Sequence, residues 1–145
     1  MNPAEIFLSG IVATSLMTAF SYLVAALRKS QFREPELLNI LLSRSKKFPK
    51  NPGKKNVIGW VIHYFIGWIF VFVMALLFTF TEQEPTLGVG AFLGFIAGII
   101  GISGWRIFFF FSNDPPEIEF DLFYFQLIIA HIIFGFGAAL VFDYY

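Results

Sequence analysis

The sequence has no cysteine and little charge. Asp, Glu, Lys and Arg together make up only 14% of the 145 residues, whereas 57% are hydrophobic and 21 are phenylalanine. The absence of cysteine excludes disulfides, thiolate metal sites and catalysis by a thiol. A water-soluble domain of this length has no interior large enough for so much apolar side chain. A single membrane domain over residues 1–145 is therefore predicted.

The sequence also lacks the residue patterns of common catalytic sites. It has no nucleophile paired with a base, no phosphate-binding loop and no metalloprotease helix. An enzyme acting on lipid would have to rely on Arg106 and an acidic loop at 112–121. Enzymatic activity is therefore not expected, and a non-catalytic carrier-like or interaction subunit of unknown specific activity is favoured.

Four apolar segments are long enough to cross a bilayer as helices. They lie at about 6–27, 57–80, 87–111 and 122–142, and each exceeds the roughly 20 residues that a spanning helix needs. Short connections favour antiparallel neighbours. The predicted fold is thus an all-α integral membrane protein with four transmembrane helices in an up-down-up-down bundle.

The positive charge is concentrated in one connecting segment. Nine of the ten Lys and Arg residues fall within 28–56. Basic loops remain on the cytoplasmic side, so this loop is predicted to be cytoplasmic and both termini outside, in a bacterial cytoplasmic membrane. Anionic phospholipids are favoured over nucleic acid as partners of the segment, and a purely topological role is the alternative. The predicted headgroup contacts are Arg44, Lys46, Lys47, Lys50, Lys54 and Lys55.

The same segment contains a short helical pattern. Glu34, Pro35 and Glu36 suit the first turn of a helix, and the leucine-rich residues 37–42 follow. About ten residues cannot span a bilayer. We predict a short amphipathic helix, lying flat in the membrane interface between the first and second spans.

The third span carries a stripe of glycines. Gly90, Gly94 and Gly98 recur every four residues and Gly101 continues the stripe. In lipid, small residues let helix backbones approach closely, and this contact joins helices. The span is therefore predicted to be the central packing helix. The stripe fits another span of the same chain or a second copy in a homo-oligomer, or another membrane subunit.

Two histidines, His63 and His131, lie inside the second and fourth spans. These spans run in the same direction, which places both imidazoles at similar depth. An ionisable residue within a membrane is a functional hypothesis by default. The candidate intramembrane site comprises His63, His131, the glycines four residues later, Gly67 and Gly135, and the first-span hydroxyls of Thr14 and Thr18.

Three interpretations of the histidines remain open. Each ring can bond to a neighbouring helix, or the pair can serve transport or proton relay. The third interpretation is a small b-type cytochrome, in which the two rings bind one haem b. Apart from that alternative no cofactor is predicted.

The loop before the fourth span is acidic. Its carboxylates are Asp114, Glu117, Glu119 and Asp121. The spacing of a calcium loop, with its central glycine, is absent, so no metal site is predicted. Pairing with the basic segment on the same face is expected instead.

Two short matches suggest an internal repeat. Residues 10–14 align with 94–98, and residues 62–67 align with 130–135. The matches occur in the same order in both halves, which favours two copies of one helix hairpin. Such copies would be parallel repeats about an axis normal to the membrane.

Overall fold

The computed structural model describes residues 2–45, 52–112 and 114–144, and within these ranges it contains helices and no strands. The helices are α1 (Pro3–Arg28), α2 (Glu34–Arg44), α3 (Val57–Thr81), α4 (Leu87–Phe111) and α5 (Phe120–Tyr144). The predicted all-α class is confirmed, and the four long helices match the predicted ranges to within three residues at each end. All four are long and apolar enough to cross a membrane.

Polar residues just before the helices fix where they begin. The Asn2 side chain accepts a hydrogen bond from the Glu5 amide at 3.0 Å, and the Glu5 carboxylate bonds back to the Asn2 amide at 2.9 Å. Asn56 caps α3 in the same way through the Ile58 amide, at 2.9 Å. These side chains satisfy amide groups that the first helical turn leaves without partners.

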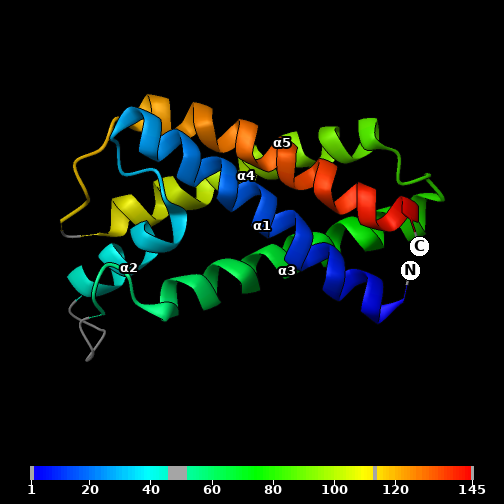
Figure 1. The fold of residues 1–145 in the computed structure, drawn as a ribbon, viewed down its shortest axis with the longest axis horizontal. Coiled ribbons are helices and arrows are strands. Elements are labelled where there is room, and N and C mark those ends of the chain that lie inside the picture. Colours follow the sequence, from blue (N-terminus) through cyan, green and yellow to red (C-terminus); the bar gives the residue numbers. More distant parts are fainter. Residues whose placement is uncertain (1, 46–51, 113, 145) are drawn as a thin grey trace.

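The four long helices form a bundle with one open side. α4 packs most extensively on α5, α5 also packs on α1, and α1 packs on α3, but α3 and α4 make almost no close contact. Figure 1 shows both termini at one end of the bundle and α2 at the other. The gap in helix packing between α3 and α4 is where the candidate site described below is located.

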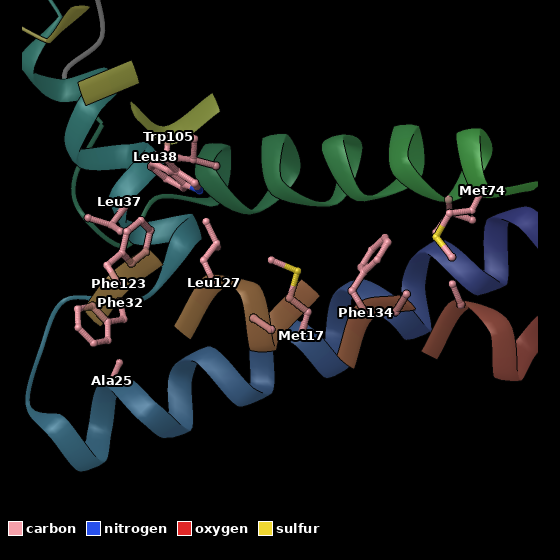
Figure 2. Packing of buried hydrophobic residues seen from close by; sticks show 14 of the residues in the cluster. Met17, Ala25, Phe32, Leu37, Leu38, Met74, Trp105, Phe123, Leu127 and Phe134 are labelled. Carbon is pink, nitrogen blue, oxygen red and sulfur yellow. The ribbon is translucent and has the colours of Figure 1, made fainter. Parts of the chain in front are cut away.

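The core at the α2 end is built from rings and leucines of several helices. Phe32, in the connection between α1 and α2, is fully buried, with its ring centre 5.9 Å from that of Phe123 in α5. Figure 2 shows these two rings beside Leu37, with Trp105 beside Leu38. The connection that leads into α2 is thereby anchored to α5.

α2 begins as predicted, with a proline and two acids in its first turn, but its surroundings differ from an interfacial helix. Leu37 and Leu38 are buried in the core. The Asn39 amide donates to the carbonyls of Lys54 and Asn56 and accepts from the Gly59 amide, at 3.0, 2.7 and 2.9 Å. The first half of α2, residues 34–39, is therefore buried in protein, unlike an interfacial helix, whereas residues 40–43 are half-buried and Arg44 is exposed.

The glycines of α4 lie against α5. A Cβ added at Gly94 would overlap the carbonyl oxygen of His131, and one added at Gly135 would overlap that of Gly90. Gly98 faces Ile128. Because α5 covers this stripe, a second copy of the chain is not needed to do so.

The outer surface of the bundle is apolar. Each long helix exposes large hydrophobic side chains, for example Phe7, Phe65, Phe92 and Phe125. Exposed apolar surface of this extent is unfavourable in water and suits lipid. Together with the four long apolar helices, it identifies an integral membrane protein.

Candidate functional site

A cavity of about 200 Å³ lies within the bundle, and all five helices contribute to its wall. Most of the lining is apolar, and the polar side chains are those of Thr14, Glu34, His63 and His131. Ile100 and Phe108 of α4 line the cavity and are also about half exposed, at 55% and 47%. The cavity therefore reaches the outer surface on the open side of the bundle, between α3 and α4.

The imidazole of His63 is fixed by a hydroxyl of α1. Its Nε2 lies 2.9 Å from Oγ1 of Thr18, and that hydroxyl donates its proton to the Thr14 carbonyl at 2.6 Å. A hydroxyl has one proton to donate. The Nε2 of His63 must therefore be the donor in its bond to Thr18, and the ring has the Nε2-protonated tautomer.

His131 has the opposite tautomer. Its Nδ1 lies 2.8 Å from the carbonyl oxygen of Leu127, one turn earlier in α5. A carbonyl only accepts, so Nδ1 carries the proton, and in the neutral ring Nε2 is the acceptor. A Cβ at Gly101 would lie 3.0 Å from this Nε2. The glycine at position 101 therefore makes room for the imidazole beside the cavity.

The structure brings most of the predicted site residues together. His63, His131, Gly67 and Thr14 all line the one cavity. Gly67 is close enough to Thr14 that any side chain there would overlap the threonine hydroxyl. Thr18 reaches the site through its bond to His63.

Gly135 does not line the cavity. It lies against Gly90 and Gly94 of α4 instead. Positions four apart share a helix face only approximately, since 3.6 residues make a turn. On α5, His131 therefore lines the cavity, whereas Gly135 contacts α4.

The bis-histidine haem of the sequence analysis stays a prediction. Two rings binding one iron would each have to direct an unprotonated nitrogen at the metal. In the tautomers derived above these nitrogens are Nε2 of His131 and Nδ1 of His63, because Nε2 of His63 bonds to Thr18. In residues 2–45, 52–112 and 114–144, no three His, Asp or Glu side chains are grouped to hold a metal ion.

Glu34 is a site residue that the sequence analysis did not find. Its side chain is buried, with 1% of its surface exposed, and it lines the cavity. The Ser21 hydroxyl donates to its Oε1 at 2.6 Å, and the Gln126 amide donates to that hydroxyl, also at 2.6 Å. Oε2 has no hydrogen-bond partner. Burial raises the pKa of Glu34 to about 7.

The position of Glu34 in the sequence hid its role. An acid in the first turn of a helix is already explained by the helix dipole. The available signal was on other helices: Ser21 and Gln126 are polar residues inside apolar spans, and buried polar groups require partners.

The basic segment pairs in part with acids of the protein. The Arg44 guanidinium lies 3.4 Å from the Asp114 carboxylate and also donates to the Asp114 carbonyl at 2.7 Å. The predicted pairing of the acidic loop with the basic segment is confirmed at this contact. Lys54 lies 3.4 Å from Glu36, and Lys55 is exposed. Lys46, Lys47 and Lys50 lie outside the described residues.

The chain matches no protein-family model, no curated protein and no solved structure. Its function has to be inferred from the residues of the cavity themselves.

Proposed function

We propose that the protein is a non-catalytic, carrier-like membrane protein that binds a small amphipathic molecule in the cavity between α3 and α4. The supporting observation is an apolar cavity with few polar groups, located where two helices of the bundle do not pack. Ligand sites in proteins typically combine an apolar wall with a few polar groups that fix orientation. The opening lies on the apolar outer surface, so the ligand enters from the bilayer.

We further propose the up-down-up-down order, with both termini outside a bacterial cytoplasmic membrane and the segment 28–56 inside. The concentration of Lys and Arg in that segment supports this orientation. The position of both termini at one end and of α2 at the other is compatible with it (Figure 1). The exposed Lys55 and its basic neighbours would then face anionic headgroups.

Cysteine labelling tests this orientation. Because the chain has no cysteine, Gly53→Cys and Gln83→Cys each give a single thiol at an exposed position without changing any charge. A Cβ at Gly53 meets no atom within 4 Å. In intact cells an impermeant thiol reagent should label the Gln83 variant, and the Gly53 variant only after lysis. The reverse pattern would overturn the orientation.

The two hairpins, α1 with α3 and α4 with α5, are proposed to be parallel repeats. In each pair a histidine and the glycine four residues later face the first helix. His63 meets Thr18 while Gly67 meets Thr14, and in the second pair His131 meets Gly101 while Gly135 meets Gly94. The two pairs agree in which face of the second helix meets the first, but not in register, because Gly135 meets Gly94 whereas Thr14 aligns with Gly98.

Fluorescence quenching tests for a ligand in the cavity. Trp105 lines the cavity and is 8% exposed. In a Trp60→Phe, Trp68→Phe background it is the only tryptophan. In phosphatidylcholine nanodiscs, a short-chain brominated alcohol should quench its fluorescence saturably, because the number of cavities is finite whereas partitioning into lipid is not saturable.

A matched pair of variants localises the binding. Gly104 lines the cavity, Gly88 does not, and neither would bring an added Cβ within 4 Å of another atom. Gly104→Phe should fill the cavity and abolish saturable quenching, whereas Gly88→Phe should preserve it. The proposal would be contradicted if quenching in the parent rose linearly with the alcohol concentration, or if saturable quenching persisted in Gly104→Phe.

A further inference from the structure

We propose that Glu34 is the recognition group of the cavity and that the ligand is an amphipathic cation, an apolar chain with a protonated amine. This inference rests on the proposed function, since it names the class of molecule that the same cavity binds. The supporting observation is a buried carboxyl. One of its oxygens is hydrogen-bonded to the protein, and the other has no protein partner.

One oxygen of the Glu34 carboxyl is bonded to protein and the other is not. Oε1 is held by Ser21, which Gln126 supports in turn, so the carboxyl is fixed by α1 and α5. Oε2 has no hydrogen-bond partner, although the side chain is 1% exposed and lines the cavity. An unpaired buried carboxylate is strongly unfavourable. An ammonium group in the cavity would supply both a hydrogen-bond donor to Oε2 and a positive charge to balance the carboxylate.

A basic side chain of the protein would compete with a cationic ligand for Glu34. Among the described residues that line the cavity there is no Lys or Arg. The nearest basic residue in sequence, Arg33, directs its guanidinium to Glu36 at 3.5 Å and over the ring of Tyr22 at 5.3 Å. Among the described residues, Glu34 therefore has no ion-pair partner, and a cationic ligand would be the first group to neutralise its charge.

The other polar groups of the cavity also suit a cation. The Thr14 hydroxyl is buried without a hydrogen-bond partner, and the Nε2 of His131 is an acceptor in the tautomer derived above. An ammonium carries up to three donors and no acceptor, which suits a site that presents acceptors. Phe70, Trp105 and Phe134 are also in the wall, and a cation that lies over the face of an aromatic ring is stabilised.

Binding of the cation should depend on pH. Glu34 must be ionised to bind a cation strongly, and burial raises its pKa to about 7. Below that pH the affinity for the cation should fall by about tenfold per pH unit. The other titratable or charged groups near it are Tyr22 on α1, Arg33 and Glu36 beside it, His63 on α3 and His131 on α5. α4 contributes only Arg106, which is exposed.

The experiment compares two probes of equal chain length, a brominated alkylammonium and the corresponding alcohol, with the Trp105 protein in phosphatidylcholine nanodiscs. At pH 8 the ammonium should bind about tenfold more tightly or better, as expected for a charge-assisted bond. Glu34→Gln should reduce this preference to about one. Glu36→Gln, a buried acid of α2 that does not line the cavity, should retain the preference.

The outcomes separate this inference from the proposed function. Equal affinity of the parent for the two probes, or an ammonium preference that survives Glu34→Gln, would overturn the role of Glu34 and leave the cavity as a binding site. Saturable binding of neither probe would overturn the proposed function. If Glu34→Gln does not fold, the ratio of the two affinities in the parent decides: it should fall between pH 8 and pH 5, and a constant ratio contradicts the inference.

Discussion

We expect Gly94→Leu to lower the thermal midpoint of the purified protein in detergent by about 10 °C or more, equivalent to about 3 kcal/mol for a chain of this size. Gly94 belongs to the most extensive helix contact of the bundle, that of α4 with α5. A Cβ there would overlap the His131 carbonyl oxygen and lie 3.1 Å from the Gly135 Cα. Because these are backbone atoms, the side chain has no neighbour that can rotate away, and the helices must separate.

Two variants of α4 serve as controls. Gly88→Leu introduces the same side chain at a position where a Cβ meets no atom within 4 Å, so its midpoint should stay close to that of the parent. Leu93→Ala removes a partly buried side chain beside the stripe and should be milder than Gly94→Leu. Equal midpoints for Gly94→Leu and Gly88→Leu would mean that α4 does not pack on α5 through this stripe.

The helices were predictable because their signals are local. A long apolar run and a capping residue such as Asn56 or Thr86 determine a helix and its start with little help from the rest of the chain. The partner of the glycine stripe was not predictable. Small residues at spacing four allow close approach to any helix, and only the structure shows that Gly135 of α5 is the residue opposite Gly94.

The site was predictable in part, because some of its signals are local to one helix and others depend on contacts between helices. His63 and His131 were identifiable as rare ionisable residues in apolar spans, and they line one cavity. Their tautomers depend on Thr18 and on the Leu127 carbonyl, which sequence spacing does not reveal. Glu34 could not be found from its own position in the sequence, because its burial depends on a bond to Ser21 of α1, which Gln126 of α5 supports in turn.

The second large effect that we expect is a gain of stability. In the ligand-free protein in detergent, Glu34→Gln should raise the thermal midpoint at pH 8 by roughly 10 °C, and the gain should disappear near pH 4. A displacement of the pKa from 4.5 to about 7 corresponds to about 3 kcal/mol, and that energy corresponds to roughly 10 °C for a chain of this size. Glutamine keeps an oxygen to accept from Ser21 and removes the buried charge.

The sign of this effect follows from proton linkage. Burial raises the pKa of Glu34 in the folded state, so the folded protein holds that proton more tightly than the unfolded chain does. Below about pH 4.5 both states are protonated and there is no penalty; the penalty grows as the pH rises to about 7 and is constant above it. Every other titratable group is present in both proteins, so the difference between parent and Glu34→Gln isolates Glu34.

Glu36→Gln instead breaks contacts with Arg33 and Lys54 and should not raise the midpoint at pH 8. A difference between parent and Glu34→Gln that does not change with pH would show that the Glu34 carboxyl is not buried as a charge, and a charged ligand would then have no partner in the cavity.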